Sequence, residues 1–413
     1  MAWPRQGQYL PKCDRLRSWL NGQDGLNTQN AQAPPRDEFS ACLQQHAKRL
    51  CEARNPLLWI ESADVAATRA IVRLAEVCDA TVHVAQSPGA ENVAAVTAAC
   101  GTFGTSLSEV AAHADLIVHV GYGHLHQLPL LAPRFLRGDP DAGPVSPRQH
   151  ILISGQGADA WKGALNVDWP HEPLLLDWPR ELWLDHFTRV LMAARGDGSP
   201  ADQSSETIDG TAAYLAEQLG ASRYAVFIWD EDELADELDR LLVERLLEIA
   251  QHFSQTTRCS LLPLGNDPGR TTAKETLLWL TNVASTARYI DGRWLGSREG
   301  TGTSLDDWRR RHDWIMCLRN LPSDRTLPDL PVQLMIDAAC NRPSAVLQVD
   351  SNAEAPTIVH LAGVGLDSPG HLIRVDHAFG AHMKAVAEKS EFVVTANEVL
   401  RELTGHVLLA RGL

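Results

Sequence analysis

The feature that most limits the fold of this chain is an alternation of short apolar runs with amphipathic segments, beginning near residue 56. The run Pro56-Leu-Leu-Trp-Ile60 has the length and composition of a buried strand, and residues 65–78 repeat apolar side chains at helical spacing. A second strand is predicted at 81–84 and a helix at 91–100. Strands and helices alternating at this spacing predict an α/β fold, with parallel sheets covered by helices on both faces.

The alternation continues to the end of the chain. Apolar residues at helical spacing predict further helices at residues 37–53, 106–113 and 233–253. Further strands are predicted at residues 115–121, 150–154, 225–229, 258–263, 314–318, 344–349, 357–362 and 392–395.

Candidate domain boundaries come from changes in composition. A polar connector rich in Gly, Ser and Asp spans residues 195–210 and predicts a domain boundary. We therefore predict an N-terminal segment at residues 1–55 and a first α/β domain at 56–210 plus 331–413. A second α/β domain is predicted as an insert at residues 211–330.

The net charge of −15 argues against a nucleic-acid partner, since a phosphate backbone demands a basic surface. The acidic run Asp230–Asp239 is interpreted as a solvated helix face. No apolar stretch reaches the roughly 18–20 residues that span a bilayer, and the first ten residues do not form a secretion signal. Eight cysteines without a C-x-x-C pair indicate reduced thiols, so we expect a cytoplasmic protein without membrane association.

One glycine-rich segment follows the clearest predicted strand. It reads Gly121-Tyr-Gly-His-Leu-His126, and ligands of open parallel sheets bind where strands end. His124 and His126 could share a metal, but two histidines in one loop do not complete a zinc site. An ordinary polar loop and a contact with a partner chain are the other interpretations.

Two further glycine-rich segments are weaker signals. Ser154-Gly-Gln-Gly-Ala158 lacks the third glycine of a dinucleotide fingerprint and is interpreted as a turn. Pro263-Leu-Gly-Asn-Asp-Pro-Gly269 is either a simple turn or a turn whose N–H groups bind an anion. Lys274 does not complete a P-loop, and the sequence contains no Gly-x-Ser-x-Gly elbow, so no catalytic residue is assigned.

Four segments, in order, carry a resemblance to a known family. The first is Glu61-Ser-Ala-Asp64 with the helix after it, and the second is Gly101–Val110 followed by Ala114-Asp-Leu-Ile-Val-His-Val-Gly-Tyr122. The third comprises Leu262-Pro-Leu-Gly-Asn266, Gly269, Trp279 and Asp291-Gly292. The fourth is Gly363-Val-Gly-Leu-Asp-Ser-Pro-Gly370 with Arg374-Val-Asp376. Together they resemble the B subunit of formylmethanofuran dehydrogenase.

The resemblance implies a molybdopterin-oxidoreductase-like fold, in which two nucleotide-binding-like domains hold a bis-pterin cofactor. Catalytic members of the family carry an N-terminal cysteine cluster, and a Cys or selenocysteine metal ligand followed by His. Here Cys13 stands alone, and Val84-Ala-Gln-Ser-Pro-Gly-Ala-Glu-Asn92 contains neither Cys nor His. Residues 1–55 are then a remnant of the iron–sulfur region, and we expect no cofactor and no metal.

The pattern is most similar to the degenerate B subunit of the bacterial formyltransferase/hydrolase complex. That resemblance implies a scaffold without its own active site, in tetrahydromethanopterin-linked oxidation of formaldehyde to formate during methylotrophy. Implied partners are a metal-dependent hydrolase, a formyltransferase and a C subunit, with a methanofuran-type carrier bound by the complex. The alternative is a working oxidoreductase subunit with an altered metal–pterin site. The old cofactor cleft is expected near Ser87, Pro88, Gly121, Gly265 and Asn266.

Tryptophan is common in this chain, at 12 residues. Several of these residues lie in polar, loop-like sequence: Trp161, Trp169, Trp178, Trp183, Trp294 and Trp308. Tryptophan is enriched at protein interfaces, which predicts that residues 160–185 contact a partner subunit. The other interpretation is that these rings cover the protein's own core.

Overall fold

A computed structural model describes most of the chain. The described residues are 36–128, 131–136, 147–155, 169, 171–196, 208–265, 267–283, 285–296, 304–321, 329–338, 347–348, 357–360, 364, 368–377, 380–384 and 394–413. They form two compact units. Unit 1 holds the described parts of Met1–Gln86, Pro268–Ile373 and Gly380–Leu413, and unit 2 those of Ser87–Asp267 and Arg374–Phe379.

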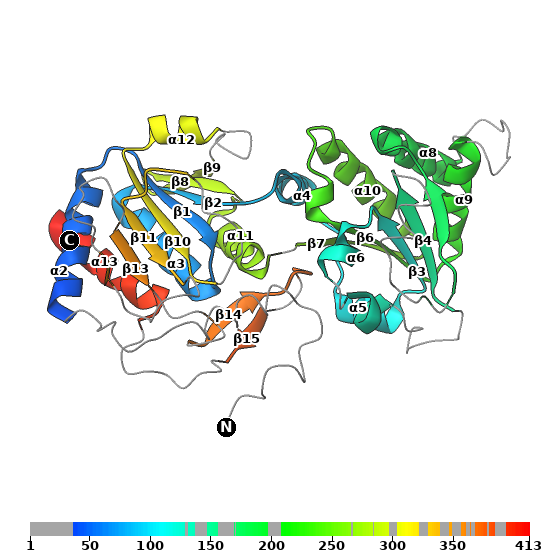
Figure 1. Ribbon diagram of the computed structural model, residues 1–413. Coiled ribbons are helices and arrows are strands. Elements are labelled where there is room, and N and C mark those ends of the chain that lie inside the picture. The colour runs from blue at the N-terminus through cyan, green and yellow to red at the C-terminus, as the bar shows by residue number, and fades with distance from the viewer. Residues whose placement is uncertain are drawn as a thin grey trace, which may run out of the picture. The chain divides into compact units, whose positions relative to one another are not determined.

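Among the described residues, the main sheet of unit 1 has eight strands in the order β12-β13-β11-β10-β1-β2-β8-β9 (Figure 1). The five central strands, β13 to β2 in this order, are parallel, and β12, β8 and β9 run antiparallel to their neighbours. The strands are β1 (Pro56–Ser62), β2 (Thr81–Val84), β8 (Thr286–Ile290), β9 (Arg293–Gly296), β10 (Trp314–Arg319), β11 (Leu334–Asp337), β12 (Leu347–Gln348) and β13 (Thr357–His360). A separate hairpin pairs β14 (Gly370–Ile373) with β15 (Gly380–Met383).

Helices cover both faces of this sheet. One face is packed by α2 (Arg36–Glu52), α3 (Val65–Cys78), α11 (Pro268–Thr281) and α13 (Ala396–Arg411), whose buried apolar side chains form one continuous core. The opposite face carries a smaller core that includes Trp59 and Trp308, the latter from α12 (Leu305–Arg311).

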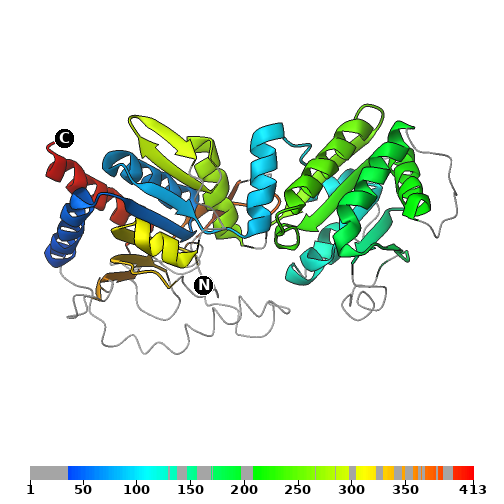
Figure 2. The same ribbon diagram turned by 90° about the horizontal axis from the view of Figure 1, so that it is seen from above.

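Unit 2 contains a five-stranded parallel sheet in the order β5-β4-β3-β6-β7, counted over the described residues. Its strands are β3 (Leu116–Val120), β4 (Gln149–Ser154), β5 (Leu174–Asp177), β6 (Tyr224–Asp230) and β7 (Arg258–Leu264). Helices α4 (Pro88–Cys100), α8 (Trp183–Arg195), α9 (Ile208–Ala221) and α10 (Asp239–Phe253) pack on one face (Figures 1 and 2). The other face is covered by α5 (Leu107–His113), α6 (Gly123–Gln127) and the π-helical turn Ala132–Leu136.

The compact units differ from the domains expected from composition. Strand β3 precedes the polar connector at residues 195–210 in sequence and β6 follows it, yet the two strands pair in one sheet of unit 2. The units instead divide between Gln86 and Ser87 and between Asp267 and Pro268. In unit 1, β11 and β13 extend the sheet beyond β10.

The tryptophans of the proposed partner-binding segment are mostly internal. Trp178 and Trp183 are 2% and 3% exposed and belong to the core of unit 2, with the Trp178 ring stacked on His186. Trp161 lies outside the described residues, and the Trp that is most exposed among them is Trp279, at 74%. For Trp178 and Trp183, burial in the protein's own core replaces the predicted interface, because both rings fill space between sheet and helices.

The acidic run Asp230–Asp239 was predicted as a solvated helix, and the structure corrects this. Asp230, Glu231 and Asp239 are each 3% exposed. The run ends strand β6, forms the 3-10 turn Glu231–Glu233 and enters α10 only at Asp239. The Asp239 carboxylate accepts hydrogen bonds of 2.6 and 2.7 Å from the Arg180 guanidinium, which compensates its burial.

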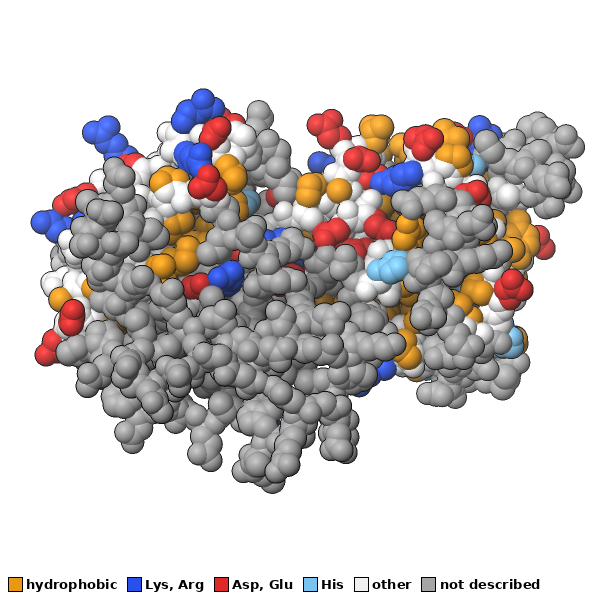
Figure 3. Space-filling view, viewed as in Figure 1, with side chains coloured by type: hydrophobic (Ala, Val, Ile, Leu, Met, Phe, Trp, Pro, Cys, Tyr) orange, Lys and Arg blue, Asp and Glu red, His pale blue; other side chains and the backbone are white. Residues whose placement is uncertain are grey.

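Charged side chains of both signs are scattered over the described part of the face drawn in Figure 3, among hydrophobic ones. In the described ranges, no helix combines the length and the apolar character needed to cross a membrane.

Candidate functional site

Each unit is doubly wound, and each therefore has a topological switch point. In unit 2 the chain runs from β3 outward to β4 and β5 and then returns to β6 on the other side of β3. In unit 1 the corresponding pair is β1 and β10. Ligands of open parallel sheets bind outside the carboxyl ends of such strand pairs. The two switch points are therefore the candidate functional sites of this chain.

At the switch point of unit 2, the turn after β3 is occupied by a carboxylate of the same chain. Glu233 Oε1 accepts hydrogen bonds from the backbone N–H groups of Tyr122 (2.9 Å) and Gly123 (2.8 Å). Convergent backbone N–H groups are the usual means of binding an anion. Glu233 thus takes the position that an external anion would take.

Gly121 makes this arrangement possible. Its φ of 75° lies in the left-handed region. A Cβ atom at Gly121 would also lie 2.2 Å from Glu233 Oε2. The glycine is needed for the turn and for the close approach of the carboxylate.

The pKa of Glu233 is raised to about 7, mainly by burial and to a smaller extent by the neighbouring Asp230 carboxylate. The N–H groups of Gly123 and Tyr122, together with Arg180, oppose this shift. The cost of burying the charge therefore exceeds what the hydrogen bonds return. Near pH 7 the carboxyl is about half protonated.

Helix α4 closes against the same acidic segment. A Cβ atom at Gly89 would lie 1.6 Å from the Glu231 carbonyl oxygen, so only glycine fits. Asn92 Nδ2 donates to the Leu234 carbonyl at 3.0 Å. On another side, His377 Nε2 lies 3.3 Å from Glu231 Oε1. The segment that closes this switch point is thus held by helix α4 and by His377.

The switch point of unit 1 is also filled by the protein itself. Asp64 caps α3 by accepting from the N–H groups of Ala66 and Ala67. Asn320, directly after β10, donates to Asp64 Oδ1 at 2.7 Å and accepts from the Asp64 N–H at 3.0 Å. Ser62 Oγ donates to the Leu321 carbonyl at 3.0 Å. Side chains and backbone from both strands therefore join across the position where a ligand would enter.

Two of the resemblance segments meet at this point. Asp64 belongs to the first segment, and Gly370 to the fourth. A Cβ atom at Gly370 would lie 2.4 Å from Val364 Cγ1 and 3.1 Å from Asp64 Oδ2. Next to them, the Glu61 carboxylate forms a buried ion pair with Arg270 and accepts a hydrogen bond of 3.3 Å from Trp59 Nε1.

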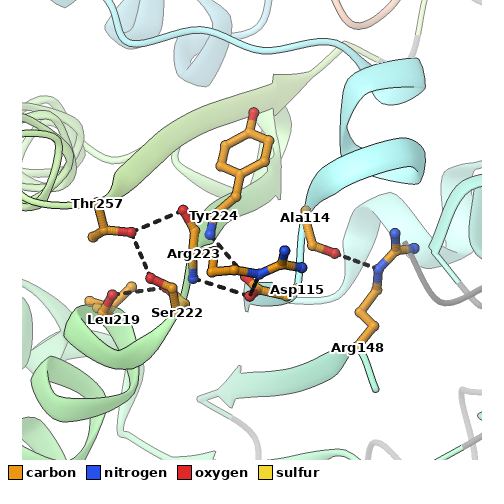
Figure 4. Close-up of polar contacts among 8 residues, drawn as sticks. All are labelled: Ala114, Asp115, Arg148, Leu219, Ser222, Arg223, Tyr224 and Thr257. Atoms are coloured by element: carbon orange, nitrogen blue, oxygen red, sulfur yellow. Dashed lines mark hydrogen bonds and ion pairs between the residues drawn. The ribbon is translucent and has the colours of Figure 1, made fainter. Parts of the chain in front are cut away.

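The second resemblance segment has a structural role at the amino ends of the unit 2 strands, opposite the switch point. Asp115 accepts from the N–H groups of Arg223 (3.1 Å) and Tyr224 (2.9 Å), which joins the start of β3 to the start of β6 (Figure 4). Arg148 is 1% exposed and donates to the carbonyl of Ala114 at 2.8 Å. It also donates to Val110, Ala111, Phe135 and Leu136.

Of the predicted cleft residues, Ser87, Pro88, Gly121 and Gly265 are described, and all four belong to unit 2. Ser87 caps α4 by accepting from the Ala90 N–H at 3.2 Å, and Pro88 is the first residue of that helix. Gly265 follows β7, and its N–H donates to the Val375 carbonyl at 3.1 Å. Asn266 lies outside the described residues. The role of these residues in binding a cofactor stays a prediction.

His124 and His126 do not converge, which disfavours the metal interpretation of their loop. His124 Nε2 lies 2.8 Å from His119 Nδ1, and His119 Nε2 lies 3.1 Å from His150 Nδ1, in a buried row of three rings. His126 is exposed and lies against Tyr122. Burial lowers the pKa of His124 and His150 to about 3.

The residues at the predicted cofactor cleft do not fit a metal–pterin group. Thiolates are the usual ligands of such metals, and the segment that bears the predicted ligand position holds Ser87, Pro88 and Gly89. Among the described residues, no group of three or more His, Cys, Asp or Glu side chains is arranged to hold a metal ion. Carboxylates fill both anion-binding positions, and like charges repel an anionic ligand.

The acidic residues at the switch point of unit 2 are not among the residues predicted from the sequence. Asp230, Glu231 and Glu233 directly follow a predicted strand, at the edge where ligands bind. Their position after a strand could have indicated a binding site. The high density of charge in the run instead favoured its interpretation as a solvated helix face. Which glycine turn Glu233 fills depends on the pairing of β3 with β6, which composition does not reveal.

The fold and these sites define a two-unit, doubly wound α/β protein whose switch points are closed by its own side chains. No family model and no curated protein matches the sequence. Among solved structures, the chain is similar to one chain of the formyltransferase/hydrolase complex FhcABCD from Methylorubrum extorquens, whose crystal structure contains methylofuran. The TM-score is 0.70 at 21% identity, over 91% of this chain and 97% of that chain. This likeness shows a shared fold over nearly the full length of both chains.

Proposed function

We propose that this chain is the B-type subunit of a formyltransferase/hydrolase complex and serves as a scaffold without its own active site. Its place would be in tetrahydromethanopterin-linked oxidation of formaldehyde to formate. Its partners would be the hydrolase, formyltransferase and C subunits, which handle a methanofuran-type carrier. The shared fold with a chain of that complex and the four ordered sequence segments support this assignment.

One observation carries the non-catalytic part of the proposal. The Glu233 carboxylate accepts hydrogen bonds from the N–H groups of the turn after β3, at the point where a doubly wound unit binds its ligand. Asp64 and Asn320 close the equivalent point in unit 1. A subunit that retains its fold while its own side chains occupy the ligand positions is suited to hold partners rather than to bind a cofactor.

Co-expression with the neighbouring genes tests the proposal. The chain should co-purify with a hydrolase and a formyltransferase, and the complex should release formate from a formylated pterin. Glu233→Gln and Asp64→Asn, each folded by circular dichroism, should leave the activity per assembled complex unchanged. A complex that forms and works equally well without this chain would refute the scaffold role.

The alternative, an active oxidoreductase subunit, predicts a different result. Purified complex would then reduce an artificial electron acceptor with a formylated carrier as electron donor. It would also contain molybdenum or tungsten together with an extractable pterin. Loss of that activity in Ser87→Ala, with assembly intact, would favour the alternative over the scaffold.

A further inference from the structure

The hairpin β14–β15 carries two histidines directly opposite each other. His371 and His382 are cross-strand partners, and both side chains are exposed. Their ring centroids lie 4.8 Å apart with an interplanar angle of 47°. Both belong to unit 1, and neither is part of the switch points described above.

The environment of this pair differs from that of the buried row His119, His124 and His150. In the buried row, the rings use their nitrogens to hydrogen-bond one another, inside an apolar core. No ring hydrogen bond is observed for His371 or His382 within the described part of the chain. Both residues are exposed, and imidazole is a common metal ligand.

Strand β14, which carries His371, is held firmly by its neighbours. The N–H of Ile373 donates to Thr272 Oγ1 at 2.8 Å, and Leu372 packs with Leu321 and Val364. Gly370 packs closely against Val364, because a Cβ atom at Gly370 would lie only 2.4 Å from Val364 Cγ1. The backbone that carries His371 is therefore preorganised, which lowers the entropy lost when a second ligand joins the same ion.

The geometry suits a chelate. Imidazole nitrogens bind a divalent ion at about 2 Å, so two ligands of one ion lie about 3 Å apart. Rings with centroids 4.8 Å apart can bring one nitrogen each to that separation by rotation about the side-chain bonds. Imidazole suits Cu²⁺, Ni²⁺ and Zn²⁺, and water would complete the coordination of an exposed site.

We propose that His371 and His382 form a surface site for a divalent transition metal, with Cu²⁺ bound more tightly than Ni²⁺ or Zn²⁺. The ion clamps β14 to β15 across the hairpin. The order of affinities follows from the general preference of nitrogen ligands among these ions. The site is independent of the proposed function, because it lies on residues that the scaffold argument does not use.

Titration of chelator-treated, tag-free protein with Cu²⁺ tests the site, with calorimetry and electron paramagnetic resonance as readouts. In the wild type the resonance should show coupling to two nitrogens. His371→Asn and His382→Asn should each weaken binding by about tenfold or more, because the second ligand no longer acts intramolecularly. His126→Asn, which removes an exposed imidazole elsewhere, is the matched control and should change nothing.

Equal affinity and unchanged nitrogen coupling in the double variant His371→Asn/His382→Asn would overturn the proposal. If a variant disturbs the hairpin, a second measurement on the wild type decides. Diethyl pyrocarbonate modifies exposed histidines, and peptide mapping reports each one. Protection of His371 and His382 together by Zn²⁺, with His126 still modified, supports the site, and equal modification with and without Zn²⁺ refutes it.

Discussion

The Glu233 carboxyl is held in a position that costs free energy when it is ionised. Burial raises its pKa to about 7, whereas in the unfolded chain the carboxyl ionises near its ordinary pKa of 4.5. The folded protein therefore binds this proton more tightly than the unfolded protein does. Stability from this group is fully present below pH 4.5 and is lost as the pH rises through about 7.

Glu233→Gln should remove this pH dependence, because an amide keeps the hydrogen bonds from Tyr122 and Gly123 without a charge. Relative to wild type, the variant should gain roughly 2–4 kcal/mol between pH 4 and pH 8, from a shift to about 7. Urea unfolding across this range measures the effect. Glu237→Gln, at an exposed position of the same run, is the control. Parallel stability curves for wild type and Glu233→Gln would contradict the assignment.

Arg148 is a second residue whose role is visible only in the folded chain. Its guanidinium joins the end of α5 to the turn at Ala132–Leu136 through five backbone carbonyls. Arg148→Met should cost roughly 3–5 kcal/mol, since buried carbonyls lose their donors. Thermal and urea unfolding measure this loss. Arg195→Met, at an exposed position of the same unit, should stay close to wild type, and a similar small change for Arg148→Met would argue against the role.

At the scale of secondary-structure elements, the first turn of α4 and the segment Glu231–Leu234 depend on each other. Gly89 lets the helix backbone approach the Glu231 carbonyl, and Asn92 bonds to the Leu234 carbonyl. This contact orients the 3-10 turn that carries Glu233. The closing of the switch point is thus a property of two packed elements rather than of one side chain.

Gly89→Ala tests that contact. The added methyl group meets backbone rather than a movable side chain, so the variant should lose about 2–3 kcal/mol. Hydrogen exchange at Tyr122 and Gly123 should accelerate, because the turn no longer holds Glu233 in place. Gly405→Ala in α13, where a Cβ meets nothing within 4 Å, should instead gain about 0.5–1 kcal/mol. Because the expected changes in stability have opposite signs, a general effect of alanine can be distinguished from the specific contact at Gly89.

At the scale of the whole molecule, the switch points of both units are filled by the protein's own side chains. We expect iron, molybdenum and tungsten far below one atom per chain in protein made by cells supplied with all three. Elemental analysis of the purified protein, with and without its partners, measures this. Stoichiometric molybdenum or tungsten would contradict the scaffold proposal and revive the oxidoreductase alternative.

Much of the fold could be predicted from the sequence. The strands at β1, β2, β3, β6, β7 and β10 were predicted from short apolar runs, because buried parallel strands need continuous apolar side chains on both faces. Asp64 caps α3 and Ser106 caps α5, and both are residue types that commonly precede a helix. Short, mostly exposed elements such as β9 and α12 were not predicted, because few of their side chains are buried.

The pairing of strands, and everything that depends on it, was decided by the tertiary structure. The connector at 195–210 looked like a domain boundary, yet β3 and β6 on either side of it pair in one sheet. The same pairing brings Glu233 to the turn at Gly121, which turned an apparently solvated acidic run into the lining of a candidate site. Local patterns report which segments bury apolar side chains. They do not report which distant segment each one is buried against, because that is settled by packing over the whole core.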